Sequence, residues 1–103
     1  MRIVIQSPGF KADQKLLNFV TKKLQNLGHL NETIIEGNVC LKMDKSGTQE
    51  NKICEIKLVV PGNDLFAVKN SQKFQDAITK SVNALKNQLS DLKPENKGGT
   101  VLQ

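Results

Sequence analysis

The sequence is poor in aromatic side chains, in histidine and in arginine. Its 103 residues include four phenylalanines, no tyrosine, no tryptophan and a single histidine. That histidine, His29, follows a predicted helix, and its isolation argues against most metal centres and histidine-based catalytic sites. Arg2 is the only arginine, so lysine supplies almost all of the 15 basic charges.

Long apolar runs are also missing. No segment approaches the roughly 18 consecutive apolar residues that span a membrane. The chain opens on a short strand-like segment instead of the apolar core of a signal peptide. Two cysteines without an export signal are typical of a reducing compartment. We therefore expect a cytoplasmic protein with no membrane partner.

Four segments have the composition of β-strands. Residues 2–6 are rich in β-branched side chains and end at a Ser-Pro-Gly turn. Residues 39–43 and 53–60 alternate apolar and polar side chains around a polar, glycine-bearing tract, a pattern that predicts a hairpin. Residues 64–69, after a Pro-Gly-Asn turn, are predicted to form a fourth strand.

The alternation also predicts the register of the hairpin. If both apolar faces point inward, Leu41 lies opposite Cys54, and Gly47 and Thr48 form a two-residue turn. Cys40 then points outward and Cys54 fills the core, so the two thiols stay free. The outward positions of this register contain no aromatic side chain: Asn38, Cys40, Lys42, Glu55 and Lys57.

Two segments have the spacing of amphipathic helices. The first covers about 17 residues, with Asp13 just inside its start and Gly28 at its end. The second has Ser71 at the N-cap position and ends at Pro94. The apolar stripes consist of Leu16, Val20, Leu24 and Leu27 in the first helix, and of Phe74, Ala77, Ile78, Val82, Leu85, Leu89 and Leu92 in the second.

The predicted order of elements is therefore β-α-β-β-β-α. Each strand that alternates has one apolar face and each helix has one apolar stripe, so both helices are expected to pack on the same face of a four-stranded sheet. The fold class is α+β, a two-layer sandwich. We expect one domain over residues 1–93 and a flexible tail over residues 94–103.

Catalytic constellations are missing from the sequence. The carboxylates are dispersed, and no pair has a spacing that brings two together on one helix face. No glycine motif that cradles phosphate is present. We expect no enzyme, no cofactor, no bound metal and no small-molecule substrate.

Lysines gather on the two predicted helices. Helical geometry places Lys11, Lys15 and Lys22 within about 40° of one another, with Lys23 on the edge of the apolar stripe. In the second helix, one flank carries Lys73 and Lys80, and the other carries Lys86 and Lys93. With Asp13, Asp76 and Asp91, the predicted helical layer carries as much net charge as the whole chain, +5. This distribution favours a phosphate-binding surface over a merely solvated one.

The aromatic side chains bear on the mode of recognition. Phe19 and Phe74 lie at or beside the apolar stripes and Phe66 lies on a predicted strand, so only Phe10 is expected to be exposed. A sheet that stacks bases needs aromatic side chains on its open face. We therefore expect contacts with the backbone and shape of a structured RNA.

Three segments together resemble the bacterial ribosome hibernation promoting factors, also called ribosome-associated inhibitors or sigma-factor modulation proteins. These are residues 62–67 (Gly-Asn-Asp-Leu-Phe-Ala), 76–78 (Asp-Ala-Ile) and 85–89 (Leu-Lys-Asn-Gln-Leu), and residues 3–6 and 12–16 are similar to the family's first strand and helix. The resemblance covers about residues 1–93. It implies a fold similar to double-stranded-RNA-binding domains.

The resemblance also implies a function and a site. Members bind the small ribosomal subunit and its rRNA in the channel used by messenger and transfer RNA, and they silence translation in stationary or starved cells. After Gln88 and Leu89 the family usually continues with a dense basic run, whereas this chain has Ser90 and Asp91. Carried over by position, the RNA-binding residues are Lys22, Lys23, Lys80, Lys86 and Lys93, to which the lysine pattern adds Lys15 and Lys73.

The chain resembles the short form of the family, which lacks a second, dimerising domain, and we expect a monomer away from the ribosome. Two alternatives stay open. One is a generic duplex-RNA-binding module. The other is a protein-interaction regulator, such as a transcription-factor modulator, that uses the open sheet face or an edge strand.

Overall fold

The computed structural model describes residues 1–44, 49 and 51–96, with side chains up to residue 91. The observed order of elements is β-α-β-β-β-α, as the sequence predicts. The elements are β1 (Arg2–Gln6), α1 (Gln14–Leu30), β2 (Glu36–Met43), β3 (Lys52–Val59), β4 (Leu65–Ser71) and α2 (Phe74–Asn96).

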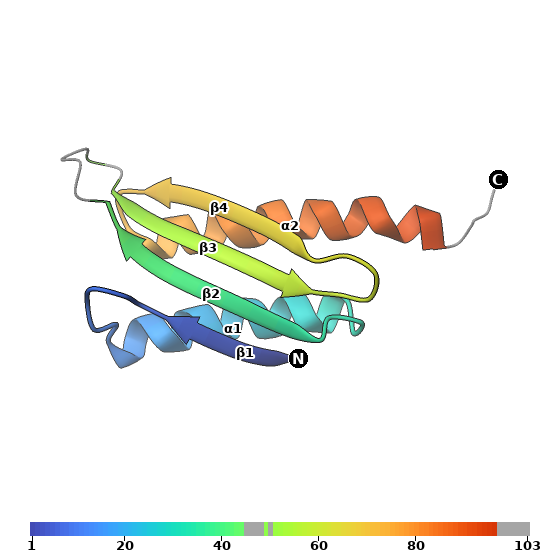
Figure 1. The fold of residues 1–103 in the computed structure, drawn as a ribbon, viewed down its shortest axis with the longest axis horizontal. Coiled ribbons are helices and arrows are strands. Elements are labelled where there is room, and N and C mark those ends of the chain that lie inside the picture. Colours follow the sequence, from blue (N-terminus) through green and yellow to red (C-terminus); the bar gives the residue numbers. More distant parts are fainter. Residues whose placement is uncertain (45–48, 50, 97–103) are drawn as a thin grey trace.

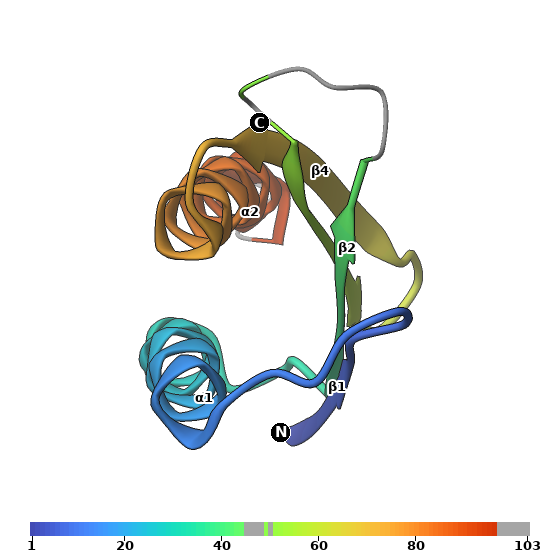
Figure 2. The same ribbon diagram turned by 90° about the vertical axis from the view of Figure 1, so that its left-hand side faces the viewer.

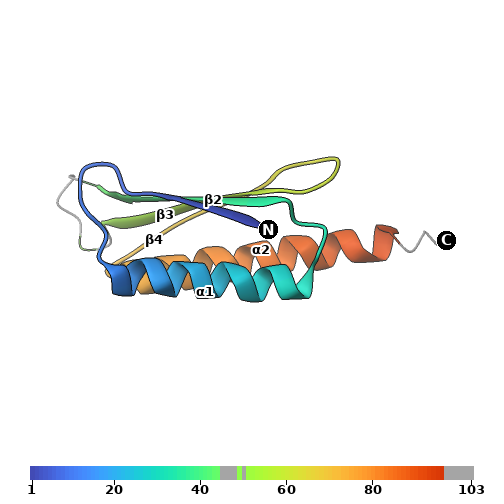
Figure 3. The same ribbon diagram turned by 90° about the horizontal axis from the view of Figure 1, so that it is seen from below.

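The sheet has the order β1-β2-β3-β4 (Figure 1). β1 is parallel to β2, because α1 connects them as a crossover, and the other two pairs are antiparallel. Both helices lie on one face of the sheet, α1 on the β1 side and α2 on the β4 side (Figure 2). The end of α2 projects past the sheet (Figure 3). The prediction of a two-layer α+β sandwich is confirmed.

The predicted register of the β2–β3 hairpin is confirmed. Leu41 pairs with Cys54, so alternate residues of both strands point into the core. Cys54 is fully buried and Cys40 is half-buried on the opposite side of the sheet, and both thiols are free, as predicted. The predicted turn residues Gly47 and Thr48 lie outside the described part of the chain.

The core lies between the sheet and the two helices. Its largest fully buried side chains come from both helices and from the two central strands: Leu24, Leu27, Leu41, Ile56, Leu58, Ile78 and Leu85. Gly37 of β2 lets α1 approach the sheet, because a Cβ there would lie 2.9 Å from Leu24 Cδ1. The buried Ser81 hydroxyl donates a hydrogen bond of 3.2 Å to the Cys54 carbonyl and so ties α2 to β3.

The ends of α1 differ from the prediction. Asp13 is the N-cap, outside the helix, and its carboxylate accepts a hydrogen bond of 2.8 Å from the Leu16 amide. The helix continues beyond Gly28 to Leu30, so the prediction that Gly28 ends it is wrong. Gly28 instead allows a close approach, because a Cβ there would lie 2.8 Å from Met1 Cε.

The ends of α2 also differ from the prediction, which placed them at Ser71 and Pro94. Ser71 is the last residue of β4, where it pairs with Lys52 of β3, so it is not an N-cap. The helix begins at Phe74, and its geometry extends through Pro94 to Asn96. A proline in the last helical turn loses one backbone hydrogen bond, but its fixed φ matches that of a helix. Of the tail expected over residues 94–103, residues 97–103 lie outside the described part.

Two phenylalanines do not lie where the sequence predicts. Phe10 is partly buried, because its ring stacks on that of Phe74 with the centroids 5.0 Å apart and an angle of 12° between the planes. Phe66, by contrast, is 61% exposed. It lies on the side of the sheet away from the helices, because its neighbour Ala67 takes the inward position of β4. The prediction that the open face has no aromatic side chain is therefore wrong.

Candidate nucleic-acid interface

The lysines of α1 lie on the part of the helix that faces away from the sheet. Lys15 and Lys22 are exposed, since the buried positions Leu16, Val20, Leu24 and Leu27 take up the opposite side. Lys23 is half-buried, and its ammonium lies 5.5 Å from the centroid of the Phe19 ring. This cation–π contact holds Lys23 along the flank of α1.

That flank of α1 faces α2. Lys23 and Leu30 are seven residues apart, which places them on the same side of the helix. Leu30 and Leu27 share a hollow of about 170 Å³ with Lys86 and Leu89 of α2. Lys23 and the exposed Lys86 therefore flank the surface between the two helices.

The other flank of α2 lies beside the edge strand β4. Here Lys80 shares an open hollow of about 320 Å³ with Lys69 of β4 and with Asn83 and Asn87. Lys73 is exposed just before the first residue of α2, and its carbonyl accepts a hydrogen bond from the Ala77 amide. Of the predicted lysines, Lys23 and Lys86 thus flank the surface between the helices and Lys80 lies beside β4, whereas Lys15 and Lys22 lie on the outer side of α1. Lys93 lies on α2, and its side chain is outside the described part.

Lys69 is a basic residue that the sequence analysis missed. It pairs with Cys54 of β3, an inward position, so it lies on the helix side of the sheet at its edge. Its signal in the sequence is the alternation with Ala67 and Ser71, which becomes visible only when the fourth strand is extended to residue 71.

The charge of the helical layer is one unit lower than the sequence predicts. Because α2 extends to Asn96, Glu95 belongs to the helix and not to the tail. Counted with their preceding residues, the two helices carry eight lysines against four acids, since Glu95 joins Asp13, Asp76 and Asp91. The layer is nevertheless strongly basic.

We call the surface formed by the predicted lysines the helical face: Lys15, Lys22, Lys23, Lys73, Lys80, Lys86 and Lys93. Within the part of the chain whose side chains are described, none of these lysines forms an ion pair. The ammonium groups of the six lysines whose side chains are described are therefore available to an external anion.

The charges on the opposite surface are mostly paired. Arg2 Nε lies 3.8 Å from Glu36 Oε1, and Lys42 Nζ lies 2.8 Å from Glu55 Oε2. The hydrogen bond and the charge of Glu55 raise the pKa of the Lys42 ammonium above its ordinary value. This side of the sandwich offers an external anion fewer free cations than the helical face does.

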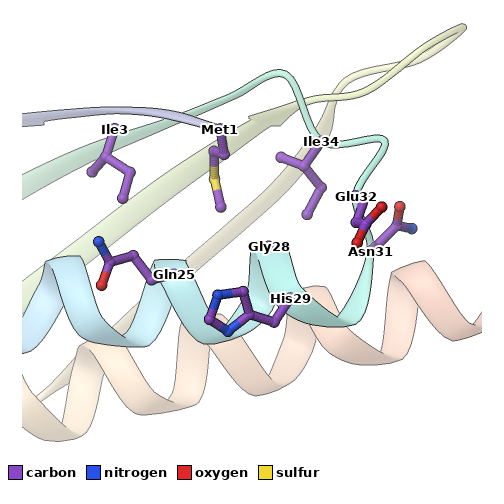
Figure 4. A pocket seen from close by; sticks show the side chains of 8 residues that line it. All are labelled: Met1, Ile3, Gln25, Gly28, His29, Asn31, Glu32 and Ile34. Carbon is purple, nitrogen blue, oxygen red and sulfur yellow. The ribbon is translucent and has the colours of Figure 1, made fainter.

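A separate hollow of about 360 Å³ lies between the end of α1 and β1 (Figure 4). Met1, Ile3 and Ile34 line its apolar side, and His29 and Glu32 stand at its polar side (Figure 4). Among the described residues, no group of three or more His, Cys, Asp or Glu side chains can hold a metal ion. The described helices also include none that is long and apolar enough to cross a membrane.

The comparison with protein families identifies the chain. The profile of the family described as sigma 54 modulation protein / S30EA ribosomal protein matches residues 3–97, which is nearly the whole sequence. The chain belongs to this family. It is the family of the hibernation promoting factors, so the resemblance seen in residues 62–67, 76–78 and 85–89 is confirmed.

Solved structures agree on the fold. A ribosomal subunit interface protein from Coxiella burnetii has a TM-score of 0.81 and 22% sequence identity, over 90% of this chain and 98% of that one. The N-terminal domain of Protein Y from Thermus thermophilus has a TM-score of 0.76 and 20% identity, over 90% of this chain and 100% of that one. A search of curated proteins finds no match.

Membership in the hibernation promoting factor family supplies the broad function. The protein is a ribosome-associated hibernation or modulation factor. The family in general acts by binding and not by catalysis, and association with ribosomes implies a cytoplasmic place of action.

Proposed function

We propose that this protein silences ribosomes by binding the rRNA of the small subunit, in the channel for messenger and transfer RNA, through its helical face. The observation that carries the proposal is the set of exposed lysines on α1 and α2 that form no ion pair in the part of the chain whose side chains are described. Phosphate recognition needs positive charge at suitable spacing, and lysine provides it as a point charge. No catalytic group and no cofactor take part.

The placement of the lysines suits a folded RNA. Lys23 and Lys86 flank the surface between the helices, Lys22 is exposed on the outer side of α1, and Lys80 with Lys69 lies on the far flank of α2. Such a spread of cations over two helices suits phosphates on separate strands of a structured RNA. It does not suit the reading of base edges, which requires hydrogen-bonding side chains aimed into a groove.

Sedimentation with ribosomes and with separated subunits tests this proposal. We expect the protein to comigrate with the small subunit at low salt and to dissociate at high salt. The Lys22→Gln/Lys86→Gln variant should dissociate at lower salt than the wild type. The matched control is Arg2→Gln/Lys42→Gln, which removes the same amount of charge from the ion pairs of the opposite surface.

Three results would contradict the proposal. Equal losses of binding in both double variants would mean that only the net charge of the protein matters. Binding of free duplex RNA as tightly as of ribosomes would favour the generic duplex-RNA module. Failure to bind ribosomes at low salt would favour the protein-interaction alternative, which a pull-down from nuclease-treated lysate would then test.

A further inference from the structure

The open sheet face carries one exposed aromatic ring on the edge strand β4, at the end of a short row of polar groups. We use the term open sheet face for seven outward residues on the side of the sheet away from the helices: Gln6, Asn38, Cys40, Glu55, Lys57, Phe66 and Val68. Phe66 is 61% exposed and pairs across β3–β4 with Lys57, which in turn pairs with Asn38 of β2. The Gln88 amide donates a hydrogen bond of 2.8 Å to the Phe66 carbonyl, so α2 holds the backbone that presents the ring.

A shallow hollow lies beside this ring. It has a volume of about 160 Å³ and is lined by residues from all four strands, with Phe66 and Val68 as its exposed apolar side chains. The pockets that enclose drug-sized ligands are larger, at roughly 300–1,000 Å³. The hollow therefore suits one flat ring lying on the sheet and not an enclosed small molecule.

The polar groups around the hollow match the parts of a nucleotide. Three basic residues of the described strands lie on this side of the sheet. Arg2 is paired with Glu36 and Lys42 with Glu55, whereas Lys57 has no acidic partner in the described part of the chain. The side-chain amides of Gln6 and Asn38 line the same hollow. An ammonium suits a phosphate, amides suit base edges, and an aromatic ring suits the face of a base.

We propose that the open sheet face binds an unpaired nucleotide of single-stranded RNA. The base stacks on Phe66, and the ammonium of Lys57 contacts the adjacent phosphate. The Gln6 amide donates to or accepts from the base edge, and the Asn38 side-chain carbonyl oxygen accepts from it, since Asn38 Nδ2 already donates to Glu36 Oε2. This inference goes beyond the proposed function, because it uses the side of the sheet opposite the helical face. It adds a contact that does not depend on the helical lysines.

The size of the apolar patch favours a base over a protein partner or a second copy. A stable protein interface buries about 800 Å² on each partner. Phe66 and Val68 are the exposed large apolar side chains of this hollow, and its other lining residues are mostly polar. A single nucleotide base is large enough to cover these two side chains. The basic character of the whole chain, with a net charge of +5, also favours a polyanion.

The first test compares binding of an eight-nucleotide single-stranded RNA with binding of an abasic oligonucleotide of the same length. We expect Phe66→Ala to bind the RNA between about five-fold and one-hundred-fold more weakly than the wild type, since one stacked base contributes that much. The abasic strand should not distinguish the two proteins. Phe66→Tyr keeps a ring and should keep the affinity.

The matched control is Ile35→Ala. Ile35 is exposed to nearly the same extent, 58% against 61% for Phe66, but does not line the hollow. This variant should bind the RNA like the wild type. Because both positions are exposed, neither substitution is expected to unfold the protein, which thermal unfolding followed by circular dichroism checks.

The second test uses the wild-type protein and the thiol of Cys40. Cys40 lines the hollow, whereas Cys54 is buried and its pKa is raised to about 11 by that burial. Alkylation by iodoacetamide near pH 8 should therefore report on Cys40, and saturating single-stranded RNA should slow it several-fold. RNA held only by the helical face would leave the rate unchanged.

Several results would overturn the inference. They are equal affinity of Phe66→Ala and Ile35→Ala for the RNA, equal loss with the abasic strand, and a Cys40 alkylation rate that RNA does not change. Protection of Cys40 that grows with protein concentration in the absence of RNA would show a second copy on this face. Each of these can occur while the helical variants still release ribosomes, so the two proposals fail separately.

Discussion

The two faces of the sandwich use charge in opposite ways. On the helical face, lysines such as Lys22 and Lys86 are exposed and have no ion-pair partner in the described part of the chain. On the other side of the sheet, Arg2 and Lys42 are held by Glu36 and Glu55. The two faces therefore differ less in whether they carry basic residues than in how many of those residues are held in ion pairs.

The faces also differ in their aromatic side chains. Phe10 and Phe74 stack on each other at the start of the helical layer, and Phe19 lies under the ammonium of Lys23. These rings support the fold or hold a lysine. Phe66, on the other side of the sheet, is exposed. The helical face is thus suited to phosphates, and the open sheet face has a ring that can stack.

The largest expected effect comes from reversing charge on the helical face. Replacing Lys22 and Lys86 by glutamate removes two of the proposed phosphate contacts and adds repulsion, so we expect affinity for ribosomes to fall on the order of one-hundred-fold. Both side chains are exposed, so thermal unfolding should be unchanged. Fluorescence anisotropy of labelled protein with ribosomes measures the affinity. A loss below three-fold would remove the distinction between the faces.

The next effect concerns the junction between the two layers. Gly37→Ala places a Cβ 2.9 Å from Leu24 Cδ1, whose side chain is fully buried, and should lower the free energy of unfolding by about 1–3 kcal/mol. Urea unfolding measures it.

Gly28→Ala is the matched control for that change. Its Cβ would meet the end of the Met1 side chain, which is partly exposed and can move. Because alanine favours a helix over glycine, this variant should be stabilised by up to about 1 kcal/mol. Equal destabilisation by both substitutions would contradict the role assigned to Gly37.

The buried thiol of Cys54 should make the stability of the protein depend on pH. Burial raises the pKa of Cys54 to about 11, above the roughly 8.5 of an exposed thiol. The folded state holds this proton more tightly, so the stabilisation is complete below about pH 8.5 and is lost as the pH rises towards 11. We expect a loss on the order of 1–2 kcal/mol by about pH 10.

Unfolding in urea at pH 8 and pH 10 checks this. The pH-dependent loss should be smaller in Cys54→Ala than in the wild type, and unchanged in Cys40→Ala, whose thiol lies on the other side of the sheet. An identical loss in the wild type and in Cys54→Ala would refute the assignment.

The smallest effect is expected for a paired charge on the open side of the sheet. Arg2→Gln breaks a long, exposed ion pair with Glu36 at 3.8 Å, so the free energy of unfolding should change by less than about 1 kcal/mol. Affinity for ribosomes, measured by the same anisotropy titration, should stay within two-fold of the wild type. A ten-fold loss would show that Arg2 itself contacts the ribosome, despite its ion pair with Glu36.

Much of the fold could be predicted because alternation and helical spacing are local signals. The opposition of Leu41 and Cys54 followed from the requirement that both apolar faces of the hairpin point inward. The helices followed from stripes such as Leu16, Val20 and Leu24. These signals do not depend on distant parts of the chain.

What could not be predicted depends on contacts between distant residues. The segment 64–69 has no clear alternation, so the outward position of Phe66 became apparent only from its pairing with Lys57. The stacking of Phe10 on Phe74 joins residues far apart in the sequence. Lys69 was missed because the strand that carries it runs to Ser71, where the sequence indicated a helix cap.

The most direct test of the central claim is the salt dependence of binding to the small subunit. If about five lysines contact phosphates, the logarithm of the affinity should fall against the logarithm of the salt concentration with a slope of roughly −3.5 to −4.5. Lys22→Gln/Lys86→Gln should flatten the slope by about 1.4–1.8, and Arg2→Gln/Lys42→Gln should leave it unchanged. A slope near zero, or the same change in both variants, would contradict phosphate binding by the helical face.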